Sequence, residues 1–258
     1  MPTDAPAHLA KLTFEEARAL FAHNPVALWP VGSTEPHGPH LALNTDVIIA
    51  EGMADRAARL LLARGDAAVI LPSLPLGVTE FGRDFTGALS VPAEAIIAMV
   101  VGVARSLKRD GARALVLVNA HLEPGQLRAL TDAAHQASAL TGLPTCFPDK
   151  TRPAIARTLG DEFKSGACHA GQYETSMVLA VEPTAVRSQL ANALPRVDIS
   201  LSRAIRAGMT SFKDAGGARA YFGAPALATA QEGEERLITL AHHVLTELDA
   251  MLGTPRGG

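Results

Sequence analysis

Val26-Ala-Leu-Trp-Pro-Val31 is an uninterrupted apolar run, and it leads directly into Gly32-Ser-Thr-Glu-Pro-His-Gly-Pro-His-Leu-Ala-Leu-Asn-Thr-Asp46. A short apolar run of this kind is typical of a strand that is buried on both faces, as the strands of parallel sheets are. The loop that follows is punctuated by glycine and proline and carries Glu35, His37, His40 and Asp46. Burying acids and imidazoles at this density is costly unless something neutralises them, and a metal ion does so most directly.

A second strand of the same kind lies at Ala114-Leu-Val-Leu-Val118, and its end is also followed by an imidazole and a carboxylate, His121 and Glu123. Shorter apolar runs predict further strands at 67–71 and 144–147. Apolar residues at helical spacing predict helices at 14–22, 47–63, 92–108, 125–140, 174–181 and 234–251. Because strands that alternate with helices form a parallel sheet with helices on both faces, we expect an α/β three-layer sandwich in a single domain, residues 1–258.

Composition limits the classes of function. The net charge of −3 provides no basic stripe, so we expect no nucleic-acid partner. No apolar run approaches the roughly 20 residues needed to cross a bilayer, so we expect no membrane span. The two cysteines, Cys146 and Cys168, form no framework of disulfides, and the first residues contain no secretory signal pattern. A cytoplasmic protein is therefore expected.

Two acid–imidazole pairs indicate a metal site. Glu35 and His37 are two residues apart, as are His121 and Glu123, so each pair points to one side of an extended backbone. Both pairs follow the carboxyl ends of predicted parallel strands, where open α/β sheets bind ligands. Asp46 lies nine residues after His37, close enough to return across the loop.

Two imidazoles and three carboxylates are too many ligands for one tetrahedral zinc with an open position, and they suit two divalent ions. Each ion would take one imidazole and one terminal carboxylate, with the third carboxylate as a bridge. The nitrogen and oxygen donors fit Zn²⁺ first, with Mn²⁺ or Fe²⁺ as alternatives. A lone acid in such a loop is more often solvated, and a lone imidazole more often sits in the core with a hydrogen bond. For His40 we expect that hydrogen-bonding role, since Pro39 turns the chain.

The segment Cys168-His-Ala-Gly-Gln-Tyr-Glu-Thr-Ser176 holds a further candidate. His169 precedes Ala-Gly, which suits a tight loop with the ring exposed to a cavity, and an imidazole there can move protons near neutral pH. Glu174 either orients this imidazole or caps the next helix, and the role of Gln172 stays open. Cys168 reads as a small buried residue because no cationic neighbour is evident.

Six motifs of the chain stand out. They are Gly32-Ser-Thr-Glu-Pro-His-Gly-Pro-His-Leu41, Thr45-Asp46, Phe85-Thr-Gly-Ala-Leu-Ser90, Asn119-Ala-His121, His169-Ala-Gly-Gln-Tyr-Glu-Thr-Ser176 and Phe222-Gly-Ala-Pro-Ala-Leu-Ala-Thr-Ala-Gln-Glu-Gly233. Together they resemble the motifs of the creatininase (creatinine amidohydrolase) family. The resemblance covers most of the chain in the family's order. It implies a dinuclear metallohydrolase with a sandwiched α/β fold, assembled as a homo-oligomer, commonly a hexamer.

The resemblance also implies roles for individual residues. Glu35, Asp46 and His121 match the ligands of one metal. His37, Asp46 and Glu123 match those of the other, so that Asp46 is the bridge. His169 matches the catalytic histidine.

Some positions depart from the family pattern. Pro36 stands where family members usually have glutamine, and Arg83-Asp84 replaces a common Glu-His pair. The regions that carry two tryptophans around the flat ring in creatininase offer Pro148 and Ser165 here. Creatinine is therefore not the expected substrate.

The resemblance and the residues together predict an amidohydrolase that cleaves a C–N amide bond in a cyclic amide, a formamide or a small carboxamide. A hydroxide that bridges the metals attacks the carbonyl, and Glu123 or His169 delivers a proton to the leaving nitrogen. Two alternatives within the family are a hydrolase of keto-sugar or lactone rings and a peptidase of peptide maturation. A non-catalytic metal-binding scaffold is the alternative from another class.

Overall fold

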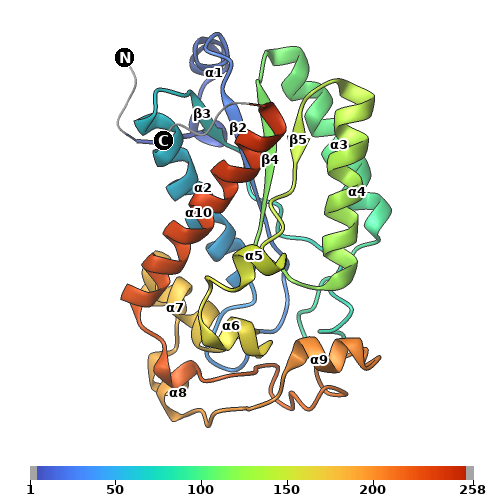
Figure 1. Ribbon diagram of the computed structural model, residues 1–258, viewed down its shortest axis with the longest axis vertical. Coiled ribbons are helices and arrows are strands. Elements are labelled where there is room, and N and C mark those ends of the chain that lie inside the picture. Colours follow the sequence, from blue (N-terminus) through green and yellow to red (C-terminus); the bar gives the residue numbers. More distant parts are fainter. Residues whose placement is uncertain (1–4, 254–258) are drawn as a thin grey trace.

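The computed structural model describes residues 5–253, and its centre is a five-stranded sheet in the order β1-β3-β2-β4-β5 (Figure 1). All four strand pairs of this sheet are parallel. The strands are β1 (Ala7–His8), β2 (Val26–Val31), β3 (Ala68–Ile70), β4 (Ala114–Asn119) and β5 (Thr145–Cys146). The expected α/β sandwich with a parallel sheet is confirmed.

The helices follow the predicted order. They are α1 (Phe14–Phe21), α2 (Thr45–Ala63), α3 (Ala93–Asp110), α4 (Pro124–Thr141), α5 (Pro153–Ala156), α6 (Asp161–Ser165), α7 (Gln172–Val181), α8 (Ser188–Ala193), α9 (Leu201–Arg206) and α10 (Ala230–Leu252). Short 3₁₀ turns lie at Leu9–Lys11, Pro183–Ala185 and Pro225–Leu227. The structure differs from the sequence prediction in the short helices α5, α6 and α8, which were not predicted, and in α2, which begins at Thr45, so that Asp46 lies in its first turn and not in the preceding loop.

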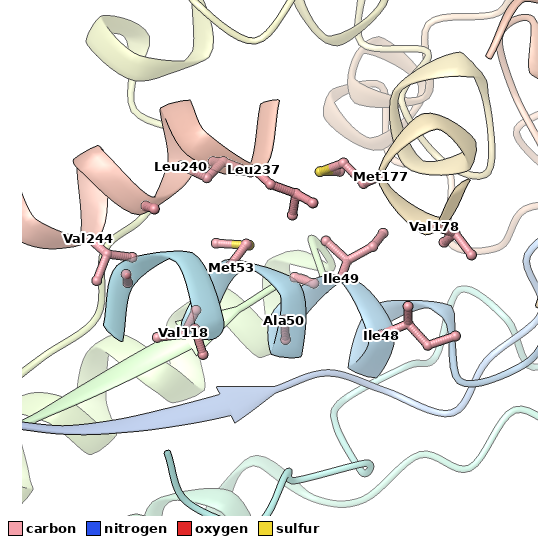
Figure 2. Close-up of a cluster of buried hydrophobic side chains, with 14 of the residues drawn as sticks. Ile48, Ile49, Ala50, Met53, Val118, Met177, Val178, Leu237, Leu240 and Val244 are labelled. Atoms are coloured by element: carbon pink, nitrogen blue, oxygen red, sulfur yellow. The ribbon is translucent and has the colours of Figure 1, made fainter. Parts of the chain in front are cut away.

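Alternate residues of the central strands feed two separate cores. Val26 and Leu28 of β2 belong to the core beneath α2, α7 and α10, and Figure 2 shows Ile49 of α2 beside Leu237 of α10 in that core. Ala27 and Trp29 belong to the opposite core, beneath α3 and α4. Because both faces are covered, every residue of β2 is buried, which explains its uninterrupted apolar sequence.

Proline in a central strand removes a backbone donor, and its position in β2 explains why it is tolerated. The pairing of β2 with β3 ends at Leu28 and Ile70. Pro30 lies beyond that last pair, and its carbonyl accepts a hydrogen bond from the backbone N–H of Leu74 at 2.9 Å. On its other side β2 stays paired with β4 as far as Val31 and Asn119. The strand end that precedes the acidic loop is therefore fixed from both sides.

Helix α7 rests on α10 by direct contact of main chains. A Cβ atom added to Gly233 of α10 would collide with the backbone carbonyl of Ser176 in α7. The same pair is joined by a hydrogen bond of 3.2 Å from the Ser176 hydroxyl to the Glu232 carboxylate. Because Gly233 has no side chain, the two helices approach closely, and α10 supports α7 in this position.

Short helices and loops gather at one end of the sheet. In Figure 1, α6, α8 and α9 lie at the lower end of the molecule, beneath the strands. None of the helices within residues 5–253 combines the length and apolar character that crossing a bilayer requires.

The two-sided burial of the central strands predicts a large cost for truncation there. Leu117 of β4 is fully buried, and we expect Leu117→Ala to lower the free energy of unfolding by about 3 kcal/mol, within a range of roughly 2–5. Leu140→Ala is the matched control, because Leu140 of α4 is 64% exposed and should cost less than about 0.5 kcal/mol. Urea unfolding monitored by circular dichroism measures both. Equal effects of the two substitutions would contradict the burial described for β4.

Candidate metal centre

Four of the predicted side chains converge where β2 and β4 end. Glu35 and His37 lie in the loop after β2, Asp46 lies in the first turn of α2, and His121 follows β4. All four are nearly inaccessible to water, with exposed fractions of 1–3%. The carboxyl ends of adjacent parallel strands thus bring together residues that are far apart in sequence, as predicted.

Gly32, the first residue after β2, allows Asp46 to reach this point. A Cβ atom at Gly32 would lie 2.7 Å from the backbone nitrogen of Val47 and 2.8 Å from the carbonyl carbon of Asp46. Both atoms belong to the main chain of α2, so they have little freedom to move aside. The absence of a side chain at Gly32 therefore lets the first turn of α2 pack directly against the end of β2.

Glu35, Asp46 and His121 form one group of potential metal ligands, with their ligand atoms within 4.8 Å of one another. The Nδ1 atom of His121 lies 3.1 Å from Oε1 of Glu35 and 3.1 Å from Oδ2 of Asp46. The structure thus brings together the three residues predicted for the first ion.

A second group of the same dimensions contains His37, Asp46 and Glu174. The Nε2 atom of His37 lies 3.4 Å from Oδ1 of Asp46 and 3.6 Å from Oε2 of Glu174. Asp46 therefore turns one oxygen toward His37 and the other toward His121. This is the arrangement expected of a carboxylate that bridges two ions.

Glu123 does not occupy the position that the sequence predicts for it. Its two carboxylate oxygens accept hydrogen bonds of 3.1 Å from the backbone N–H groups of Glu80 and Phe81, and it belongs to none of the ligand groups among the described residues. The physical reason is that these two N–H groups bind the carboxylate, although the backbone of Glu123 itself is extended. Glu174 supplies the carboxylate beside His37 instead. Glu123 still lines the cavity above the centre.

Backbone carbonyls orient all three imidazoles of the centre. Nδ1–H of His37 donates to the carbonyl of Glu35 at 3.1 Å, and Nε2–H of His121 donates to that of Val78 at 2.8 Å. Nε2–H of His169 donates to the carbonyl of Pro36 at 3.0 Å. Each ring therefore turns its other nitrogen toward the carboxylates, as in metal sites where a hydrogen bond from the far ring nitrogen fixes each histidine ligand.

The residues present fit a pair of divalent ions. Nε2 of His37 and Oδ2 of Asp46 are buried and have no hydrogen-bond partner, although buried polar atoms are otherwise nearly always paired. Both atoms face the ligand groups described above. The donors are imidazole nitrogen and carboxylate oxygen, which suit Zn²⁺ and Mn²⁺.

The charges of the centre shift the pKa values in opposite directions. Burial alone lowers the pKa of His37, but the neighbouring carboxylates outweigh it and raise that pKa to about 10. The pKa of His121 is raised in the same way, by Glu35 and Asp46. Burial raises the pKa of Asp46 too, yet the two imidazoles outweigh it and hold that pKa well below its usual value. The centre thus favours positive charge, whether it is supplied by protons or by metal ions.

Glu174 is held from the start of α7. Its carboxylate accepts a hydrogen bond of 2.7 Å from the backbone N–H of Ala170, and burial raises its pKa to about 7. Ala170 has a positive φ of 51°, which is unusual for a residue with a side chain. This turn directs both His169 and Glu174 toward the centre. Of the two roles left open for Glu174, capping is not the one found, because no side chain caps α7 at Gly171.

His169 lies at the edge of the centre and in the wall of the cavity. Its Nδ1 atom is 3.8 Å from Oε1 of Glu35, and the two residues form a third potential ligand group with His37. Its ring stacks on Phe212, with centroids 4.2 Å apart and an interplanar angle of 24°. Burial lowers the pKa of His169 to about 4, so its imidazole is neutral at physiological pH.

The segment 77–90, a long glycine-rich loop in the sequence, covers the centre. Besides the carbonyl of Val78 and the N–H groups that bind Glu123, the hydroxyl of Thr79 donates to the carboxylate of Glu35. This loop thus holds Glu35 of one predicted acid–imidazole pair and both His121 and Glu123 of the other.

Three other residues of the motifs have structural roles. Nε2 of His40 is hydrogen-bonded to the hydroxyl of Thr175 at 2.9 Å, and His40 is in no ligand group of residues 5–253, which agrees with the role expected for it. Gln172 donates to Glu232 of α10 at 2.7 Å. Burial raises the pKa of the Cys168 thiol to about 12, which is consistent with an unreactive residue.

Sequence reasoning missed one charged residue near the centre. Lys150 is only 3% exposed, and its ammonium interacts electrostatically with Glu174 and Asp46. It lies 6.0 Å from the centre of the Tyr173 ring. Burial lowers its pKa. Nothing in the local sequence Pro-Asp-Lys-Thr distinguishes it from a surface lysine, so no sequence signal was available.

Residues 10–248 match the creatininase family, described as creatinine amidohydrolase. The chain belongs to the creatininase family. Members of this family are amidohydrolases, so the protein is an enzyme. A mycofactocin precursor peptide peptidase of Mycolicibacterium smegmatis is 30% identical over 226 residues, which cover 84% of this chain and 82% of that relative. A creatinine amidohydrolase of Pseudomonas putida is 30% identical over 195 residues, which cover 69% of this chain and 73% of that relative.

Solved creatininases share the fold. The crystal structure of a creatinine amidohydrolase superposes with a TM-score of 0.73 at 22% identity, covering 98% of this chain and 99% of that one. Two other solved structures are named as a Mn form and a Zn-Zn form of creatininase. The structural likeness agrees with the parallel sheet and the surrounding helices described above.

The raised pKa of His37 predicts that metal binding releases protons. In protein from which a chelator has removed the metal, His37 keeps its proton at pH 7, because its pKa is about 10 and not the ordinary 6.5. A metal can bind only the neutral ring, so the proton has to leave when the metal binds. We therefore expect metal affinity to rise about tenfold per pH unit for each displaced proton between roughly pH 6.5 and 9, and to fall in acid. Calorimetric titration of the metal-free protein with Zn²⁺, repeated in buffers of different ionisation enthalpy, gives the number of protons released per ion bound. Binding at pH 7 without proton release would contradict the electrostatics of the centre.

Proposed function

We propose that the protein is a dinuclear metal-dependent amidohydrolase that cleaves a C–N amide bond in a small molecule. The observation that carries this proposal is Asp46, whose two oxygens face two different imidazoles within two groups of ligand size. Two divalent ions supply a nucleophilic hydroxide near neutral pH and polarise the carbonyl of the amide.

The geometry of the side chains supports a ligand assignment. Glu35, Asp46 and His121 would hold one ion, and His37, Asp46 and Glu174 would hold the other. This pairing uses every ligand once apart from the bridging Asp46, and it leaves His169 free beside the cavity. Zinc or manganese is the metal proposed, supported by the donor set and by the family structures named for these metals.

Glu123 and His169 are the residues that we propose to move protons. Both line the cavity above the centre, and both are held in place by hydrogen bonds to backbone groups. Burial raises the pKa of Glu123, so its carboxyl group can accept a proton from water and pass it to the leaving nitrogen. His169 is neutral and offers its Nδ1 lone pair, which suits it to orient the substrate or to accept a proton in turn.

The amide substrate is favoured over the alternatives within the family. The cavity wall contains Phe81, Phe163 and Phe212, which suit an apolar group better than a keto-sugar. A peptide bond is itself a C–N amide bond, and the relatives named as peptide peptidases support including short peptides in the substrate class. Creatinine stays disfavoured, because Pro148 and Ser165 stand where creatininase is expected to carry tryptophan.

Three further properties stay predictions. We propose one catalytic domain over residues 1–258, assembly as a homo-oligomer with the hexamer of the family as the expected form, and a cytoplasmic location. Mass photometry of the purified protein measures the assembly.

The number of bound metal ions tests whether Glu174 or Glu123 is a ligand of the second ion. We expect Glu174→Gln to reduce the bound zinc from two ions per chain to about one, because an amide is a poor ligand for zinc. Glu123→Gln is the matched control in the same cavity, and it should keep both ions while slowing turnover. Inductively coupled plasma mass spectrometry after dialysis measures the metal content. Loss of an ion in Glu123→Gln, with two ions retained in Glu174→Gln, would return the ligand role to Glu123.

Substitutions of Asp46, the proposed bridge, and of His169, a proposed proton-transfer residue, should affect metal content and turnover differently. Asp46→Ala should remove both bound metals and the activity together. His169→Ala should retain both metals and slow turnover on the order of 10²–10⁴-fold. Amine release from a panel of small amides, measured beside metal content, tests both variants. Activity in Asp46→Ala would refute the two-metal scheme, and loss of metal in His169→Ala would make His169 a ligand.

A further inference from the structure

A cavity of about 430 Å³ lies directly over the candidate metal centre. Its floor contains Glu35, Asp46, His121 and Glu174. Its sides are built by α5, α6 and α9 and by the loops that carry Phe81 and Phe212. Of these helices, α6 and α9 lie at the lower end of the molecule in Figure 1, beneath the strands, so they belong to the cover of the site and not to its scaffold. A volume of this size suits a ligand of small-molecule dimensions.

The inner wall of the cavity is apolar and closely packed. The backbone N–H of Phe212 donates to the carbonyl of Phe81 at 3.0 Å, and their ring centres lie 6.0 Å apart. Phe163, Leu201 and Ile205 continue this wall. Because Phe212 also stacks on His169, an apolar substrate group against this wall lies next to a side chain that we propose to take part in the reaction.

The outer part of the cavity carries positive charge that the protein does not neutralise. Arg157, which follows α5, and Arg206, in the last turn of α9, are exposed and line the cavity. Neither guanidinium forms an ion pair or a side-chain hydrogen bond within residues 5–253. Lys164, the other cation of the lining, differs because it pairs with Asp161 at 2.9 Å.

The acids of the lining do not compensate these arginines. The four carboxylates that face the cavity are Glu35, Asp46, Glu123 and Glu174, and all are buried in its floor, where imidazoles, backbone N–H groups or metal ions balance them. A guanidinium prefers a carboxylate partner, to which it presents two parallel N–H groups. The partner of these two arginines therefore has to come from outside the chain.

We propose that the amide substrate carries a carboxylate, bound by Arg157 and Arg206, and an apolar group, packed on the phenylalanine wall, with the scissile amide over the metal centre. N-acyl derivatives of apolar amino acids and short peptides with a free carboxyl end have this chemistry. The inference rests on the proposed amidohydrolase function and specifies its substrate class.

Binding of a matched pair of ligands tests the proposal. N-acetyl-L-phenylalanine has the carboxylate, and N-acetyl-L-phenylalaninol replaces it with a neutral CH₂OH group. We expect calorimetric titration of the zinc-loaded protein to give at least about tenfold tighter binding of the carboxylate. In the double variant Arg157→Gln, Arg206→Gln this preference should fall to within about twofold.

Arg203→Gln is the matched control. Arg203 lies on α9 like Arg206 and is also exposed, but it does not line the cavity. This variant should keep the wild-type preference at low and at moderate salt. A preference that survives the double variant would show that another group, Lys164 or the metal ions, binds the carboxylate and would overturn the proposal. Equal binding of both ligands, or binding of neither, would overturn it as well.

Turnover separates this inference from the proposed function. Metal-dependent hydrolysis of amides with no preference for a carboxylate would refute the substrate class alone. Arginine-dependent binding of the carboxylate ligand without hydrolysis of any N-acyl amino acid or short peptide would refute the amidohydrolase function and leave the binding site standing.

Discussion

Glu35, Asp46 and Glu174 bring three carboxyl groups into a space from which water is nearly excluded, and much of the surrounding structure serves that arrangement. Carboxylates buried together repel one another and lose their hydration, so the fold has to provide positive charge close by. Two imidazoles with raised pKa values do this in part. The same charge distribution that holds protons on the imidazoles is what a pair of dications would relieve.

Rigid main chain, and not flexible side chains, sets the geometry of the centre. The carbonyls of Glu35, Val78 and Pro36 fix the three rings. Gly32 lets α2 bring Asp46 against the end of β2. A ligand set held in this way pays little conformational entropy when a metal binds, which is the physical meaning of preorganisation at a metal site.

Much of the fold was predictable because its signals are local. The apolar runs of β2 and β4 reveal strands buried on both faces, and the pairs at their ends led to Glu35, His37 and His121. Glu123 lies outside the ligand groups of the described residues, because the backbone N–H groups of Glu80 and Phe81 bind its carboxylate, and its spacing from His121 gives no sign of that contact. Glu174 reaches the centre through the packing of α7 on α2 and α10, and no spacing within the sequence reports such tertiary packing.

Because Gly233 of α10 supports α7, the residues needed for the two ligand groups of the centre are synthesised at different times. All three ligands of the first group have been synthesised once the chain reaches His121. Glu174 is made later, and the helix it stands on lacks its support until Gly233 and the rest of α10 emerge. A nascent chain therefore contains every residue of the first ligand group before it contains Glu174 of the second group and the helix that supports it.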